Sequence, residues 1–235
     1  GDRMFLTILV SFVTIIFTWM IAFPIGIYSA MHQYSWGDYG LTFLGLLGIA
    51  TPNFLLALVM MYGANVWFGT SIGGLMAPEF VNQPMSWAKL LSILEHLWIP
   101  VIVIGTAGTA GMIRTLRANL LDELQKQYYT TARAKGLSSF RAMRKYPLRM
   151  SLNFFIADIG GILPQIISGA EIVAVVLSLE TTGPLLISAL QSQDMYLAGS
   201  FLMFLALMTV IGVLISDILL GILDPRIRLS GGTSK

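Results

Sequence analysis

Cysteine is absent from the 235-residue sequence, which excludes a disulfide framework, an iron–sulfur cluster and a thiol nucleophile. Histidine is nearly absent as well: His32 and His96 are the two in the chain, and this argues against a metal site built on imidazole. Neither an H-E-x-x-H string nor a Walker G-x-x-x-x-G-K string occurs. We therefore predict no metal, no cofactor, no ATP site and no enzymatic activity for the chain itself.

Charge is scarce too, because Asp, Glu, Lys and Arg make up 11% of the residues, against about 25% in a soluble domain. The net charge of +2 does not indicate nucleic acid as a partner, since the basic residues are confined to a few segments. Hydrophobic residues reach 56%, and the mean hydropathy is +0.77. One globular core cannot hide this much apolar surface, so the composition predicts a multi-pass protein of the lipid bilayer.

A spanning helix needs about 20 mostly apolar residues, and five stretches qualify. They are Met4–Met31, Leu41–Phe68, Ile93–Met112, Leu152–Leu179 and Gly199–Leu223. These runs are too long and too uniformly apolar for the alternating strands of a membrane barrel, so we predict an all-α polytopic helical bundle. No repeat of fixed period occurs, and residues 1–235 are predicted to form a single domain.

The distribution of Lys and Arg predicts how the bundle is oriented. Nine of the fourteen lie between Arg114 and Arg149, whereas the intervals 69–92 and 179–198 together hold Lys89 alone. Basic loops stay in the cytoplasm, so we place 113–151 and the C-terminal tail there and the other two intervals outside. Five helices with an external start fit a six-helix protein that lacks its first helix.

The basic interval contains "YYTTARAKGLSSFRAMRKYPLR", residues 128–149. Gly136 is expected to end a first helix, Ser138 or Ser139 to cap a second, and Pro147 to end or bend it. The short second helix has an apolar edge of Leu137, Phe140 and Met143 beside basic residues. The positive-inside rule alone accounts for the charge, but such a helix also suits lipid headgroups or a groove in a partner.

Within this segment "TARAKG", Thr131–Gly136, resembles the cytoplasmic EAA loop of ABC-importer transmembrane subunits. The segments 111–137, 183–200 and 224–228 also resemble the dipeptide, oligopeptide and nickel branch of that family, so the likeness covers nearly the whole chain. The resemblance implies the importer permease fold, with six helices in an intact member. It also implies three kinds of partner: cytoplasmic ATP-binding subunits, a second transmembrane permease subunit and an extracytoplasmic substrate-binding protein.

On this resemblance the chain forms half of a translocation pathway in a bacterial inner membrane, and peptides are the expected cargo. Its loop helix would sit in a cleft of the ATPase, with Phe140 in a pocket and Arg141 and Arg144 at the rim. The residues implied to couple to the ATPase are Ala132, Arg133, Ala134, Lys135, Gly136, Leu137, Ser138, Phe140, Arg141 and Arg144.

Breaks and charges inside the spans mark candidates for the pathway. The string Thr51-Pro52-Asn53 interrupts the second span, and Asp158, Gln165 and Glu171 lie in the fourth. For Asp158 and Glu171, pairing with a basic group of a partner subunit is the other interpretation. An ion-coupled secondary carrier remains an alternative function, because such proteins also carry intramembrane carboxylates.

Overall fold

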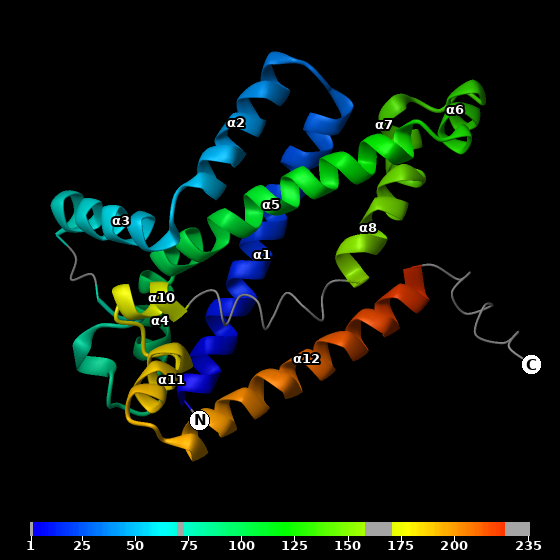
Figure 1. Ribbon diagram of the computed structural model, residues 1–235. Helices are drawn as coiled ribbons and strands as arrows, with labels where there is room; N and C mark the ends of the chain where they lie inside the picture. The colour runs from blue at the N-terminus through cyan, green and yellow to red at the C-terminus, as the bar shows by residue number, and fades with distance from the viewer. Residues whose placement is uncertain (1, 70–72, 158–170, 224–235) are drawn as a thin grey trace, which may run out of the picture.

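The computed structural model describes residues 2–69, 73–157 and 171–223, and every regular element in these ranges is a helix (Figure 1). The predicted all-α class is thereby confirmed. The elements are α1 (Asp2–Met31), α2 (Trp36–Ala50), α3 (Asn53–Phe68), the 3₁₀ helix η1 (Pro78–Phe80), α4 (Trp87–His96), α5 (Trp98–Leu124), α6 (Gln127–Ala134), α7 (Ser139–Lys145), α8 (Pro147–Ala157), α10 (Glu171–Val176), α11 (Thr182–Gln191) and α12 (Met195–Leu223).

Three of these helices are long and apolar enough to cross a membrane, namely Arg3–Met31, Trp98–Leu124 and Met195–Ile222. The first and the last agree with two predicted spans. The middle one reaches Leu124 rather than Met112, because the residues after Met112 are good helix formers and the helix continues beyond the apolar run. The predicted span Leu152–Leu179 falls partly on residues 158–170, which lie outside the described residues.

The predicted span Leu41–Phe68 is not one straight helix. Helices α2 and α3 together pass the test for a span but are bent by 99° at their junction. Pro52 lacks a backbone N–H and disfavours helical geometry in the residue before it, and Thr51 is accordingly extended, with φ −85° and ψ 118°. The sequence located the break correctly, but the size of the bend follows only from the structure.

Helices α1 and α5 lie against each other and form the centre of the molecule (Figure 1). Their contact is close because glycines face large side chains. A Cβ on Gly105 would meet Phe17 Cδ1 at 2.7 Å, and one on Gly26 would meet Leu116 Cδ2 at 2.9 Å. Small residues at such points let two helix backbones approach, so these glycines serve packing.

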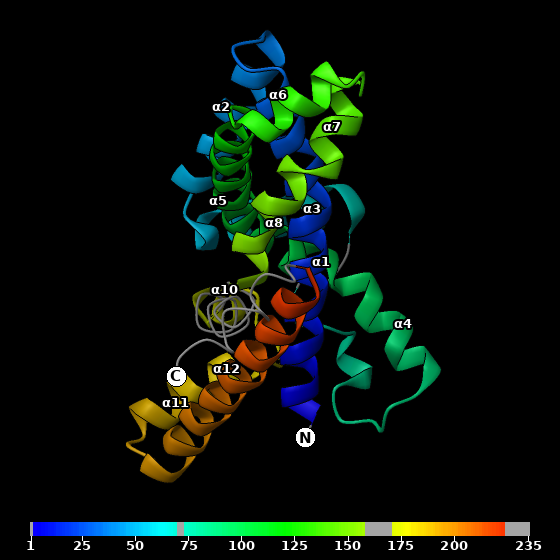
Figure 2. The same ribbon diagram turned by 90° about the vertical axis from the view of Figure 1, so that its right-hand side faces the viewer.

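Helix α12 lies at the edge of the bundle, and only 17% of its most apolar window is buried. The Ser216 hydroxyl donates a hydrogen bond to the backbone carbonyl of Ile156 in α8, and α11 packs near the other end of α12. Figure 2 shows α12 slanting away from α1. Its remaining surface is apolar, as expected for a helix that faces lipid or another subunit.

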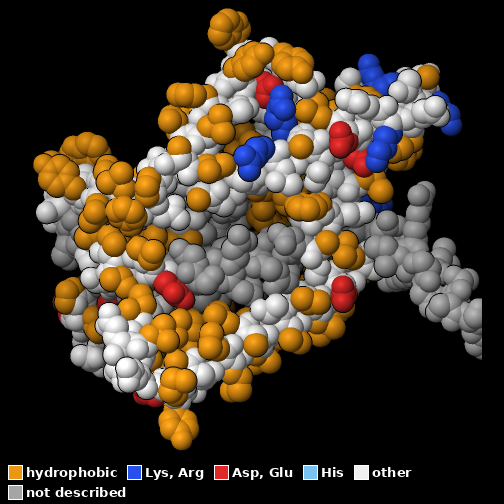
Figure 3. Space-filling view, viewed as in Figure 1, with side chains coloured by type: hydrophobic (Ala, Val, Ile, Leu, Met, Phe, Trp, Pro, Cys, Tyr) orange, Lys and Arg blue, Asp and Glu red, His pale blue; other side chains and the backbone are white. Residues whose placement is uncertain are grey.

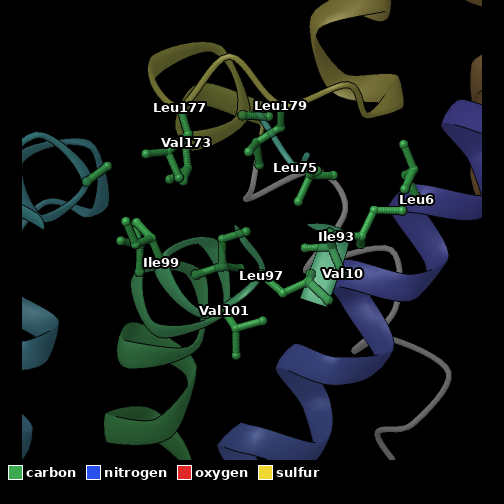
Figure 4. Close-up of a cluster of buried hydrophobic side chains, with 14 of the residues drawn as sticks. Leu6, Val10, Leu75, Ile93, Leu97, Ile99, Val101, Val173, Leu177 and Leu179 are labelled. Atoms are coloured by element: carbon green, nitrogen blue, oxygen red, sulfur yellow. The ribbon is translucent and has the colours of Figure 1, made fainter. Parts of the chain in front are cut away.

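The two intervals predicted to be external meet at one end of the bundle (Figure 4). Buried side chains of Leu75 and Ile93 join Val173 and Leu177 in one cluster with the start of α1. The Leu75 N–H donates to the Glu180 carboxylate at 2.8 Å, and the Gly74 N–H donates to the Leu177 carbonyl at 2.9 Å. Both intervals contain regular structure: η1 and the start of α4 lie in the first, and α11 lies in the second.

A candidate coupling surface at the opposite end

Helices α6 and α7 lie at the opposite end of the bundle from the N-terminus and α11 (Figure 2). The turn between them is built by Gly136, whose φ of +89° falls in the left-handed region that favours glycine. The Leu137 N–H donates to the Ala132 carbonyl and the Gly136 N–H to the Arg133 carbonyl, which together make a Schellman motif. The predicted helix end at Gly136 is therefore confirmed.

Helix α7 begins where the sequence indicated. Ser138, not Ser139, is the N-cap, and its hydroxyl accepts a hydrogen bond from the Arg141 N–H at 3.4 Å. The helix ends at Lys145, and Pro147 occupies the first position of α8, where a missing N–H costs nothing. The two short helices thus form a defined unit between α5 and α8.

One side of this unit is anchored in the bundle. The side chain of Met143 is fully buried against Leu120 of α5 and Ala30 of α1, and Tyr129 and Leu148 pack around this cluster. The anchor also shows that the end of α1 and the segment 113–151 lie at the same end, as the orientation prediction requires. Through Met143, α7 is therefore in direct contact with both central helices, α1 and α5.

The other side of the unit is open. Phe140 is 57% exposed, although it belongs to the same predicted apolar edge as the buried Met143. Leu137, the third member of this edge, is half-buried. Figure 3 shows Lys and Arg side chains gathered over this part of the molecule. The exposed members of the predicted set are Arg133, Ala134, Lys135, Gly136, Ser138, Phe140, Arg141 and Arg144.

Ala132 differs from the rest of the predicted coupling set. Its side chain is 6% exposed, so it faces the interior of the unit, and its carbonyl closes the turn described above. Nearby, the Tyr128 hydroxyl donates to the Glu123 carboxylate, which ties α6 to the end of α5. Partial burial, and after it this hydrogen bond, raises the pKa of Tyr128 above its ordinary value.

The predicted pathway residues occupy separate places. Thr51 lies at the bend, where its hydroxyl donates to the Leu47 carbonyl at 2.8 Å, and Pro52 and Asn53 begin the next helix. Glu171 is the first residue of α10. It lines a small cavity of about 20 Å³, together with Thr7 and Thr182, at the end of the bundle where α1 begins. Asp158 and Gln165 lie outside the described residues.

An ion pair that the sequence does not predict joins Asp38 in the first turn of α2 to Arg117 in α5. Asp38 is 2% exposed, and both of its carboxylate oxygens accept hydrogen bonds from Arg117, at 2.9 and 2.8 Å. Asp38 lies between the first two apolar runs, and Arg117 lies in the basic interval 113–151. Their proximity could not be read from the sequence, although both interrupt or border apolar runs.

The string from Gly69 to Gly73 has the G-x-S-x-G spacing of a hydrolase nucleophile motif, with Ser71 at its centre. In a hydrolase the serine sits on a turn between a strand and a helix. Here Gly69 instead terminates helix α3, and the parts of the chain that the structure describes contain no strand. The helix that ends at Gly69 thus stands where the motif requires a strand, and residues 70–72 lie outside the described residues.

Comparison with known proteins defines the class. Residues 22–229 match the family described as "Binding-protein-dependent transport system inner membrane component", and the chain belongs to this family of multi-pass membrane permeases. It is 36% identical over 225 residues to the oligopeptide transport system permease protein AppB of Bacillus subtilis (strain 168), an alignment that covers 94% of this chain and 69% of AppB.

Two further relatives extend the comparison. The oligopeptide transport system permease protein OppB of Mycobacterium tuberculosis (strain H37Rv) is 30% identical over 216 residues, covering 88% of this chain and 65% of OppB. A putative peptide permease protein of Brucella ovis is 31% identical over 209 residues, covering 87% of this chain and 63% of the relative. The chain thus spans about two thirds of the length of these relatives.

Proposed function

We propose that this chain is a transmembrane subunit of an ATP-driven, binding-protein-dependent importer of peptides in a bacterial inner membrane. Family membership and relatives named as peptide permeases support this function over an ion-coupled carrier. The proposed partners are cytoplasmic ATP-binding subunits, a second permease subunit and an extracytoplasmic substrate-binding protein. The chain contributes half of the pathway and performs no chemistry of its own.

The observation that carries the proposal is the two-sided construction of α7. Its inner side is fixed to α1 and α5 through Met143, while Phe140 and basic residues project outward. An exposed aromatic side chain, with exposed arginines on the same short helix, is a suitable anchor for a pocket in a partner, because aromatic and arginine side chains are enriched in interfaces. In this proposal an ATPase grips the outer side, and its closure on ATP moves the two central helices through the inner side.

Cross-linking tests the docking directly, because the chain has no native cysteine to compete with an introduced one. We expect Arg144→Cys, on the exposed side of α7, to form a cross-link to the ATP-binding subunit in membrane vesicles. Trp87→Cys is the control, since Trp87 is 75% exposed at the opposite end. Capture of the ATPase from position 87, or from neither position, would contradict the proposal.

For the substrate pathway we propose Thr51, Pro52, Asn53 and Glu171 among the described residues, with Asp158 and Gln165 as the remaining predicted members. Glu171 is the one whose chemistry suggests a role, because a carboxylate suits the free amine of a peptide. It is half-buried and lines the same small cavity as Thr7 and Thr182.

We expect Glu171→Gln to raise the KM for uptake of a tripeptide about tenfold, which is the loss of one hydrogen bond to a charged group. Uptake into proteoliposomes is the measurement. Glu95→Gln is the control, since Glu95 is exposed on α4 outside the cavity. An unchanged KM for Glu171→Gln would remove this residue from the pathway.

A further inference from the structure

The Asp38–Arg117 ion pair has a geometry that restricts how α2 and α5 lie together. Arg117 Nε donates to Asp38 Oδ1 at 2.9 Å and Nη2 donates to Oδ2 at 2.8 Å, so the guanidinium holds the carboxylate at two points. The Tyr34 N–H also donates to Oδ2, at 3.0 Å. This last bond fixes the turn between α1 and α2 to the same carboxylate.

The contact continues along both helices in a constant antiparallel register. Seven residues after Asp38, a Cβ on Gly45 would lie 4.0 Å from the Cβ of Ala110, which is seven residues before Arg117. A Cβ on Gly48 would lie 3.1 Å from Thr106 Cγ2. From Asp38 to Gly48 this contact line is about 15 Å long, at 1.5 Å per helical residue. Helix α2 is therefore held on α5 by the ion pair at one end and by close glycine packing farther along.

The two ends of this contact line lie next to two parts of the molecule that the proposed function connects. These parts are the candidate coupling helix α7 and the bend between α2 and α3. Leu120, one turn beyond Arg117 on α5, packs against Met143 of α7. Thr51, one turn beyond Gly48 on α2, is the point of the 99° bend. Arg117 thus lies between the attachment of the candidate coupling helix and the helix that leads to the bend.

We propose that Asp38 and Arg117 are positioning residues that lock α2 to α5, so that the bend at Thr51–Pro52 moves with α7. The inference rests on the proposed function, because it concerns how motion of α7 reaches the pathway. The Asp38 side chain is 2% exposed and the Arg117 side chain 25% exposed, so the carboxylate is the buried partner. In this proposal the pair contributes mainly by selecting one register of α2 on α5, since an ion pair of this kind adds little to stability when it is compared with an apolar pair. The pair acts through α2 and touches no substrate.

The test replaces the ion pair by a covalent bond. In Gly45→Cys/Ala110→Cys the two Cβ atoms would lie 4.0 Å apart, within the range of about 3.5–4.5 Å found in disulfides. The assay is uptake of a radiolabelled tripeptide per ATP hydrolysed, by the permease reconstituted with its proposed partners. We expect the oxidised cysteine pair to leave this ratio unchanged, because α2 and α5 do not separate during transport.

Asp38→Asn is then expected to lower the ratio of uptake to hydrolysis roughly tenfold, an ordinary magnitude for coupling between two sites. Oxidation of the cysteine pair in the same variant should restore the ratio, and reduction should abolish the rescue. A purely structural role would lower the amount of assembled complex but would not make the ratio depend on the disulfide. If Asp38→Asn fails to assemble, Asp38→Asn/Arg117→Gln removes both charges and leaves no unpaired buried ion.

Three results would overturn the inference: loss of transport when the cysteine pair is oxidised in the parent, an unchanged ratio in the neutralised variants, or no rescue by the disulfide. These are separable from failure of the proposed function, which Phe140→Asp reports independently. If Phe140→Asp uncouples the ATPase while Asp38→Asn has no effect, the function stands and the lock does not. If Phe140→Asp has no effect either, α7 does not dock to the ATPase through this residue, and the observation that carries the proposed function is lost.

Discussion

Replacing Phe140 by Asp is expected to abolish the stimulation of ATP hydrolysis by peptide-loaded binding protein. Phe140 is 57% exposed on the outer side of α7, and a charged side chain cannot enter an apolar pocket without a large desolvation cost. Truncation of such an anchor costs about 2–4 kcal/mol in protein interfaces, which corresponds to a loss of docking of about thirtyfold or more. The measurement is ATPase activity in proteoliposomes with and without loaded binding protein.

Phe140→Leu is the matched control, because it keeps an apolar side chain at the same exposed position and should retain most of the stimulation. Membrane insertion and the amount of chain in the bilayer should match the parent for both variants, since residue 140 makes no contribution to the buried cluster around Met143. Full stimulation in Phe140→Asp would show that α7 does not dock through this residue.

Gly136→Pro is also expected to abolish the stimulation of ATP hydrolysis, but by distorting the turn between α6 and α7. Proline fixes φ near −65°, whereas Gly136 has φ +89°, and proline also removes the N–H that donates to the Arg133 carbonyl. Both conflicts occur in the turn that sets the angle between α6 and α7, so the whole exposed surface is displaced. We expect loss of stimulated ATP hydrolysis and of peptide uptake, with insertion preserved.

The control for this position is Gly136→Asn, because asparagine enters the left-handed region more readily than other side chains and keeps its N–H. A Cβ at position 136 meets no atom within 4 Å, so steric conflict with the surroundings is not a factor. Asparagine should therefore preserve a substantial part of the activity. Equal loss in both variants would mean that the surface requires glycine for contact with a partner, not for its conformation.

The local features of the candidate site could be predicted from the sequence because they depend on short-range rules. Gly136 ends a helix and Ser138 caps the next one for reasons contained within a few residues. It was not predictable which side chains of the apolar edge are buried and which are exposed. Whether Met143 or Phe140 turns inward depends on where α1 and α5 end, and these segments lie far away in the sequence.

Long-range features show the same limit. The position of Pro52 indicated a break, but the 99° bend depends on how α2 and α3 pack on other helices. Asp38 and Arg117 lie 79 positions apart, and each has an ordinary local explanation, as a helix-start acid and as a cytoplasmic base. The third predicted span ends with the apolar run at Met112, whereas α5 continues to Leu124, because apolar composition marks the membrane and not the helix, which extends beyond it.

The sparse burial of α12 has a consequence for how the subunit assembles. A strip of Leu, Ile, Val and Met side chains along this helix has no cover within the described parts of the subunit. Lipid tails are as apolar as these side chains, so the bilayer can cover the strip while the subunit stands alone. Association with the proposed second permease subunit along α12 would therefore have to come from close side-chain packing, not from hiding apolar surface from water.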